Sequence, residues 1–160
     1  MEFRTAIGQD SHRFEEAGSE KPLVLGGVII PGATGFSANS DGDVLLHALC
    51  NAVSGITGVN ILGKPADGMC RSGITDSSAY LKEALRFLPE GAGVCNVSFT
   101  VEAARPKLAA HIPAIKENVA ALLGITPDRV GLTATTGEGL TAFGQGLGMM
   151  VFCVITVKFE

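Results

Sequence analysis

The chain has 160 residues, enough for one domain with a sizeable core, and its 12 basic and 16 acidic side chains give a net charge of −4. This mildly acidic balance, without any basic run, argues against nucleic acid and anionic membranes as partners. The longest apolar stretch, residues 148–155, is far shorter than the roughly 20 residues of a membrane helix, and a charged share of only 18% suggests that surface is buried in an oligomer.

The N-terminal segment is predicted to begin with a strand and a hairpin. Residues 3–12 favour a strand that ends in Asp10 and His12, and side chains two residues apart in a strand point to the same face. Residues 23–30 consist of two apolar triplets around a Gly-Gly pair, which is typical of a β-hairpin turn. The chain is therefore expected to open with β-structure that presents an aspartate and a histidine side by side.

The next segment is predicted to contain two helices separated by a long loop. Ser40 and Asp41 are typical N-cap residues for an apolar, largely buried helix over residues 42–56. Residues 58–76 contain Gly, Pro and Asp without any period, which predicts a long loop of the kind that is often functional. A second helix is expected over residues 77–88.

Strands and helices mix irregularly along the whole chain, which predicts an α+β or α/β fold with a mostly β core of about five or six strands. In the C-terminal half, the predicted elements are a strand with one buried face over 94–102, a helix over 107–123, a strand over 130–136 and an apolar strand over 149–159. No repeat, low-complexity tract or linker interrupts the chain, so we expect one domain over residues 1–160.

Asp10, His12 and His47 together form a set of two histidines and one carboxylate. His47 lies in the middle of an apolar helix, with Asp43 and Asn51 four residues to either side, so the three form one polar stripe that needs a partner. Taken alone, His47 is more often a satisfied core histidine, and Asp10 with His12 a surface pair. Taken together, three protein ligands with an open fourth position are the pattern of a catalytic zinc site.

A second constellation lies in the segment Ala134-Thr135-Thr136-Gly137-Glu138, where a strand runs into a glycine-rich turn. Its hydroxyls and backbone N–H groups suit phosphate oxygens, and its carboxylate suits a Mg²⁺ shared with phosphates, although such residues are also common surface chemistry. The segment 40–43 is a possible phosphate site or an ordinary helix cap. Lys107 follows a proline and could hold an anion or be a solvated lysine.

In this order, these segments resemble one family closely, the 2-C-methyl-D-erythritol 2,4-cyclodiphosphate synthases of the non-mevalonate isoprenoid pathway. The resemblance covers nearly the whole chain. The matching segments are G-x-D-x-H-R-F at 8–14, L-G-G-V-x-I-P at 25–31, S-D-G-D-V-L-L-H-A-L at 40–49, D-S-S-x-x-L-K-E-A at 76–84, R-P-K with H-I-P between 105 and 113, and A-T-T-x-E-x-L at 134–140.

The resemblance implies an α/β sandwich, a mixed sheet of four to six strands with helices on one face, assembled as a homotrimer whose sheets face the threefold axis. It implies Zn²⁺ bound by Asp10, His12 and His47, and Mg²⁺ or Mn²⁺ held by Glu138 with the substrate diphosphate, with active sites between subunits. Thr136 is implied as a further catalytic residue. The implied substrate-binding residues are Asn39, Ser40, Asp67, Ala103, Lys107, Leu108, Ala134, Thr135 and Thr136, of which Ala103, Lys107, Leu108 and Ala134 match the cytosine pocket.

The implied reaction converts 4-diphosphocytidyl-2-C-methyl-D-erythritol 2-phosphate to a cyclic diphosphate. The 2-phosphate attacks the β-phosphorus of the diphosphate in the same molecule, and CMP is released. The protein then mainly has to fold the substrate and neutralise its charge, which fits the absence of a Ser-His-Asp or Cys-His arrangement. No general base is needed, because a phosphate is already an anion at neutral pH.

Several positions depart from the family pattern. Asn39 replaces a usual histidine, Asn51 and Asn60 replace usual aspartates, and Gln145 and Leu147 replace the Arg and Glu near the trimer axis. Because an aspartate near a zinc ligand orients that ligand, the change at Asn51 suggests altered zinc affinity or turnover. The loop over residues 58–76 also differs largely from the family pattern, which leaves open a catalytically reduced trimer that binds cytidine nucleotides or isoprenoid diphosphates. A metal-dependent phosphohydrolase is a third possibility.

The cysteines bear on the cellular location. The four cysteines contain no CxxC pair and show no regular spacing, and nothing at the N-terminus resembles a signal peptide. Reduced thiols in a cytoplasmic protein are therefore expected.

Overall fold

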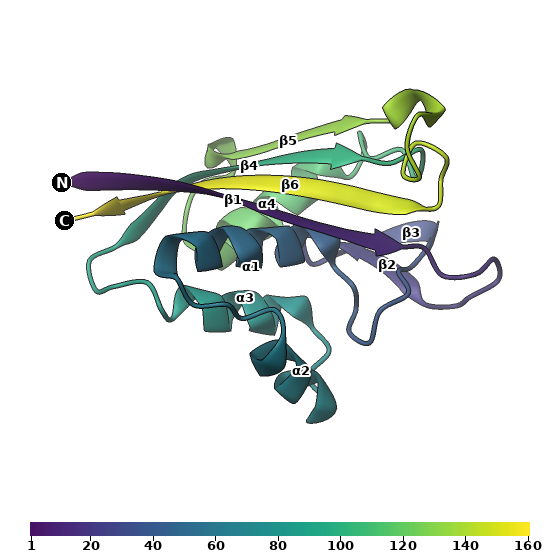
Figure 1. Cartoon of the computed structure of the whole chain (residues 1–160). Coiled ribbons are helices and arrows are strands. Elements are labelled where there is room, and N and C mark those ends of the chain that lie inside the picture. The colour runs from purple at the N-terminus through teal and green to yellow at the C-terminus, as the bar shows by residue number, and fades with distance from the viewer.

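A computed structural model describes residues 1–160 and builds them around a four-stranded mixed sheet (Figure 1). Its strand order is β1 (Glu2–Arg13), β6 (Gly148–Phe159), β4 (Gly93–Glu102) and β5 (Val130–Thr135). The β1–β6 and β6–β4 pairs are antiparallel, whereas β4 and β5 are parallel. Each of these strands lies where the sequence predicts it, to within two residues.

The predicted hairpin also forms, with strands β2 (Pro22–Leu25) and β3 (Val28–Thr34), but it makes a separate two-stranded sheet. Gly26 and Gly27 form its turn with φ of 58° and 77°, the left-handed region that glycine adopts without strain. The backbone N–H groups of both glycines donate to the carboxylate of Asp43, at 2.9 Å and 2.6 Å. The hairpin is thereby attached to the start of the first helix.

Four helices, α1 (Val44–Thr57), α2 (Lys64–Arg71), α3 (Ser77–Leu85) and α4 (Ile112–Leu123), accompany the sheet. Helices α1 and α4 cover one of its faces, and α3 lies against α1 on the side away from the sheet (Figure 1). The predicted arrangement, a mixed sheet with helices on one face, is confirmed. None of these helices is both long and apolar enough to cross a membrane.

The first helix begins later than predicted, and neither Ser40 nor Asp41 is its N-cap. The cap is Asp43, whose side chain accepts a hydrogen bond from the backbone N–H of Leu46 at 3.0 Å. Gly42 just before it has a φ of 71°, which is incompatible with a helix, so the helix starts only after that residue.

The prediction of a long loop over residues 58–76 is wrong, because this segment contains the two-turn helix α2. Pro65 lies in the first turn of α2, where proline is favoured because its missing N–H would be unpaired anyway. Asp67 in that turn and Arg71 in the last turn both complement the helix dipole. The residues that suggested a loop are therefore those that start and stabilise a short helix.

Two further helix boundaries differ from the prediction. The helix expected over 107–123 begins at Ile112, again with a proline, Pro113, in its first turn. The helix expected over 77–88 ends at Leu85 and continues as a turn, because the residue before Pro89 is kept out of the helical region.

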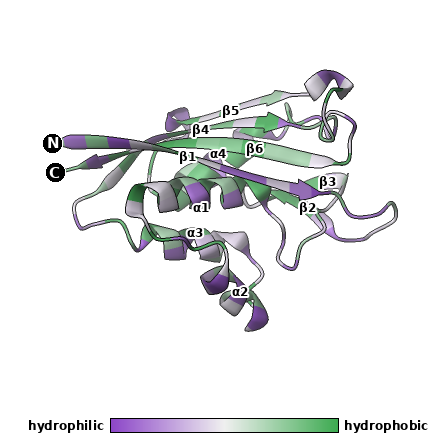
Figure 2. Cartoon of the chain, viewed as in Figure 1, coloured by the Kyte–Doolittle hydropathy of each residue, from purple (hydrophilic) through white to green (hydrophobic).

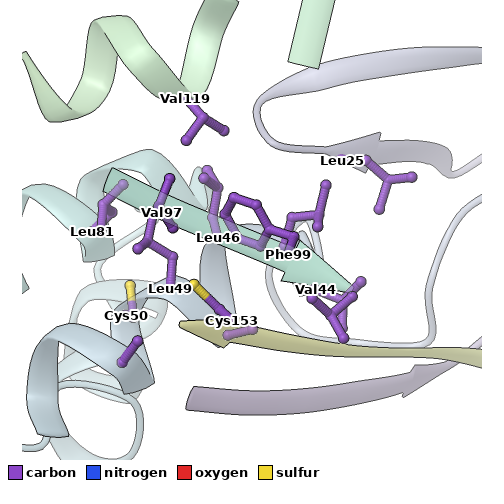
Figure 3. Close-up of a cluster of buried hydrophobic side chains, with 14 of the residues drawn as sticks. Leu25, Val44, Leu46, Leu49, Cys50, Leu81, Val97, Phe99, Val119 and Cys153 are labelled. Atoms are coloured by element: carbon purple, nitrogen blue, oxygen red, sulfur yellow. The ribbon is translucent and has the colours of Figure 1, made fainter. Parts of the chain in front are cut away.

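The core lies between the sheet and the helices (Figure 3). Val97 and Phe99 of β4 lie beside Leu46 of α1, Val119 of α4 lies above them, and Cys153 of β6 lies beside Leu49 of α1, and all of these side chains are at most 1% exposed. The apolar stripe of each strand thus meets the apolar face of a helix, which is the main source of stability in such layers.

The opposite face of the sheet remains uncovered and carries large apolar side chains. Phe3 and Ile7 of β1 are 58% and 64% exposed, and Phe152 and Val154 of β6 are each 37% exposed. Ile7 lies directly opposite Val154 in the β1–β6 register, so these side chains are neighbours. Strand β6 is hydrophobic along most of its length (Figure 2), and its outer side chains contribute to this uncovered apolar face.

Candidate functional site

Strand β1 lies directly against helix α1 because Gly8 has no side chain. A Cβ atom at Gly8 would collide with the backbone of Ala48 and Ala52 on α1. Since every second residue of a strand faces the same way, Asp10 and His12 point toward α1 as Gly8 does. The segment GQDSHRF therefore delivers an aspartate and a histidine to the helix.

The two side chains meet His47 of α1 in a compact cluster. Nε2 of His12 lies 2.9 Å from Nδ1 of His47, and Oδ2 of Asp10 lies 3.0 Å from the first nitrogen and 3.1 Å from the second. His47 is buried, and Asp10 and His12 are half-buried. The predicted grouping of these three residues is confirmed as a candidate metal site.

The cluster fits a divalent transition-metal ion in both geometry and chemistry. In a tetrahedral zinc site with bonds of about 2.0–2.1 Å, the ligand atoms lie about 3.3 Å apart, close to the distances among Asp10, His12 and His47. Two imidazoles and one carboxylate are suitable ligands, and the open side leaves a coordination position for a further ligand. Burial raises the pKa of Asp10, but the hydrogen bond from His12 and the proximity of both imidazoles outweigh it and hold that pKa below its usual value.

A cavity of about 320 Å³ opens in front of this cluster. Its lining includes three residues that the sequence predicted as substrate-binding, Asn39, Ser40 and Asp67. It also includes Cys70 and Tyr80, which the sequence analysis missed. Cys70 is one helical turn after Asp67 on α2, so a helical interpretation of that segment would have placed both on the same wall.

A second cavity, of about 300 Å³, lies where the parallel strands β4 and β5 end. Its lining includes all the residues predicted for the cytosine pocket and the two predicted threonines, namely Ala103, Lys107, Leu108, Ala134, Thr135 and Thr136. Most of these side chains are small or apolar, so polar recognition in this cavity would rely largely on backbone groups.

Glu138 is exposed and lies in neither cavity. It occupies the short 3₁₀ turn Gly137–Gly139 with a φ of 52°, which is unusual for a residue other than glycine. The backbone N–H of Glu138 donates a hydrogen bond to the hydroxyl of Thr136 at 3.3 Å. Such strained residues are often found at functional sites.

The two cavities lie at opposite edges of the four-stranded sheet. The metal cluster involves edge strand β1, whereas the second cavity adjoins edge strand β5. Three inter-strand spacings of about 4.8 Å separate these edges by about 14 Å. A single chain therefore does not bring the predicted metal ligands and the predicted cytosine pocket into one site.

The predicted polar stripe on α1 has three separate partners rather than one. Asp43 caps the helix, and Asn51 donates through Nδ2 to the backbone carbonyl of Gln9 at 3.0 Å, so Asn51 does not orient His47. The second nitrogen of His47, Nε2, instead lies 2.8 Å from the hydroxyl of Ser77, a contact that no pattern in the sequence indicates.

Comparisons with known proteins find relatives that match nearly the whole chain. The family model described as the YgbB family matches residues 3–158. A curated relative, 2-C-methyl-D-erythritol 2,4-cyclodiphosphate synthase of Chlamydia muridarum, is 50% identical over 97% of this chain and 88% of its own length.

Solved structures resemble the fold throughout its length. The bifunctional IspDF from Campylobacter jejuni matches with a TM-score of 0.87 at 33% identity, over 99% of this chain but only 43% of the bifunctional chain. A 2C-methyl-D-erythritol-2,4-cyclodiphosphate synthase in its CDP-bound form matches with a TM-score of 0.83 at 34% identity, over 97% of this chain and 100% of that chain.

Proposed function

The chain belongs to the YgbB family, and we propose that residues 1–160 form one 2-C-methyl-D-erythritol 2,4-cyclodiphosphate synthase domain. The proposed substrate is 4-diphosphocytidyl-2-C-methyl-D-erythritol 2-phosphate, and the products are the cyclic diphosphate and CMP. The enzyme is thus a phosphorus–oxygen lyase. We also place it in the cytoplasm, where its four free cysteines would stay reduced.

The observation that carries this proposal is the cluster of Asp10, His12 and His47 beside a cavity. These three residues would hold Zn²⁺, and Glu138 would hold Mg²⁺ or Mn²⁺ together with the substrate diphosphate. Bound at these places, the cations supply positive charge that offsets the repulsion between the two reacting phosphates. The residue types suit these ions, since zinc binds imidazole and carboxylate whereas magnesium prefers oxygen ligands.

We infer that the active enzyme is a homotrimer, with each site shared by two neighbouring chains. Two observations support a shared site: the metal cluster and the cytosine pocket lie at opposite edges of the sheet, and the outer face of that sheet exposes Phe3, Ile7, Phe152 and Val154. Packing these outer faces around an axis would bury the apolar side chains and bring the β5 edge of one chain toward the β1 edge of the next.

The chain's own residues would bind and orient the substrate. The cavity around Ala103, Lys107 and Ala134 would hold the cytosine, and the hydroxyls of Thr135 and Thr136 would donate to diphosphate oxygens. An oxygen of the 2-phosphate then forms a bond to the β-phosphorus as the bond from that phosphorus to the bridging oxygen breaks. The bridging oxygen leaves with the electron pair as part of CMP, so no proton transfer is needed.

A CMP-release assay tests the proposal. The purified protein is incubated with the substrate and Mg²⁺, and CMP is measured by chromatography before zinc removal, after chelation and after zinc is restored. We expect release that is lost on chelation and regained with zinc. Binding of the substrate without any release would contradict the synthase assignment and would favour a catalytically reduced binder of cytidine nucleotides.

A further inference from the structure

The metal-distal nitrogen of His47 is held by a buried hydrogen-bonded chain. Nε2 of His47 lies 2.8 Å from Oγ of Ser77, a residue with no exposed surface. The Ser77 hydroxyl is in turn hydrogen-bonded to Oδ1 of Asp41, and the backbone N–H of Ser77 donates to Oδ2 of the same carboxylate at 3.0 Å. A carboxylate, a hydroxyl and an imidazole thus follow one another toward the candidate metal site.

The direction of these hydrogen bonds follows from the protons that each group carries. The carboxylate of Asp41 can only accept, whereas a serine hydroxyl has a single proton to donate. The Ser77 hydroxyl therefore donates to Asp41, and its oxygen is left to accept a hydrogen bond from His47. It follows that Nε2 of His47 carries a proton.

The consequence for the cluster is a fixed tautomer. With Nε2 protonated, a neutral His47 presents the lone pair of Nδ1 to Oδ2 of Asp10 at 3.1 Å and to Nε2 of His12 at 2.9 Å. A carboxylate oxygen and an imidazole lone pair repel at this distance unless a cation compensates them. The hydrogen bonds from Asp41 through Ser77 to His47 therefore leave Nδ1 unprotonated and available to bind a metal ion.

We propose that Ser77 and Asp41 are positioning residues that hold His47 in the Nε2–H tautomer and thereby set the site's affinity for a divalent metal ion. This inference rests on the metal site of the proposed function. Outer partners of this kind fix the orientation of a ligating histidine and raise its basicity. Neither residue touches the ion or the substrate in this role.

Backbone hydrogen bonds hold Asp41 in place, so it is a suitable fixed end for the hydrogen-bonded series that leads to His47. Its carboxylate accepts from the backbone N–H of Asp43 at 3.0 Å, and its own N–H donates to the carbonyl of Thr75 at 2.9 Å. The segment before α1 and the segment before α3 are thereby tied together next to His47.

Zinc affinity of Ser77→Ala, measured by competition with a chelator, tests the proposal. We expect affinity about 10- to 100-fold weaker than that of the unaltered protein. Ser78→Ala is the matched control, because it removes the same hydroxyl one residue away, and we expect it to bind zinc normally. Asp41→Asn is expected to weaken binding as well, because an amide cannot accept both hydrogen bonds from Ser77. Thermal unfolding of each metal-free variant establishes that it is folded.

A measurement on the unaltered protein keeps the test independent of folding. Long-range ¹H–¹⁵N NMR of the metal-free protein, at a pH where the imidazoles are neutral, should show His47 with its proton on Nε2. A proton on Nδ1, or unchanged zinc affinity in a folded Ser77→Ala variant, would overturn the proposal. If the unaltered protein binds no zinc at all, the proposed metal site fails first, a result distinct from failure of the positioning role.

Discussion

Replacing Gly8 with alanine should separate β1 from α1 and loosen the metal cluster. The added methyl group would collide with the backbone of Ala48 and Ala52 and lie 2.9 Å from the carbonyl carbon of Asn51. None of these neighbours is a flexible side chain, so the strand has to move by on the order of 1 Å to reach ordinary contact distances. That movement is large compared with the 2.9–3.1 Å separations among Asp10, His12 and His47.

Two quantities are expected to change in Gly8→Ala. Overpacking of this kind costs about 1–3 kcal/mol, and each kcal/mol lowers the midpoint of thermal unfolding by about 2–4 °C in a chain of this size. Zinc affinity should fall by on the order of tenfold or more, because the two ligands on β1 are displaced from the one on α1. Calorimetry of the metal-free protein and chelator competition measure the two effects separately.

The matched control is Gly93→Ala on β4, where an added Cβ meets nothing within 4 Å. We expect it to leave zinc affinity unchanged and stability unchanged or raised by at most about 1 kcal/mol. A Gly8→Ala variant with the stability and zinc affinity of the control would refute the argument that Gly8 positions the cluster.

Three other outcomes are expected. Glu138→Gln should raise the Mg²⁺ concentration needed for half-maximal CMP release by about 10- to 100-fold, while zinc affinity stays unchanged. A similar loss of Mg²⁺ and zinc affinity would contradict separate roles for the two metals. Burial raises the pKa of Cys50 to about 12 and also raises that of Cys153, so both stay protonated at pH 8, and a thiol reagent should label only the other two cysteines in the native protein. Asn51→Asp should lower the free energy of unfolding in urea by about 1 kcal/mol, since aspartate cannot donate to the carbonyl of Gln9, and an unaltered unfolding curve would argue against this contact.

The metal cluster could be predicted from the sequence because its signals are local. The two-residue spacing of Asp10 and His12 matches the period of a strand, and His47 stands out as a lone basic side chain in an apolar helix. Strand β4 was predictable from an equally local signal, since its buried and exposed side chains alternate.

Other features depend on contacts between distant segments and leave no local pattern. Asp43 is the helix cap because the glycine turn of the hairpin also donates to it, and this contact does not show in the sequence around residues 40–43. Helix α2 was missed because Pro65 resembles a helix breaker unless it is known to lie in the first turn. The hydrogen bond from His47 to Ser77 spans 30 residues and depends on how α3 packs against α1.

The most direct test of the proposed function is ³¹P NMR of the reaction with the diphosphocytidyl-methylerythritol phosphate substrate, Mg²⁺ and zinc-loaded protein. The signals of the substrate should be replaced by those of a cyclic diphosphate and CMP, and an Asp10→Ala variant should leave the substrate unchanged. Release of CMP with a linear product would instead mean that water attacks the diphosphate. The protein would then be a metal-dependent phosphohydrolase, which would contradict the cyclisation proposed here.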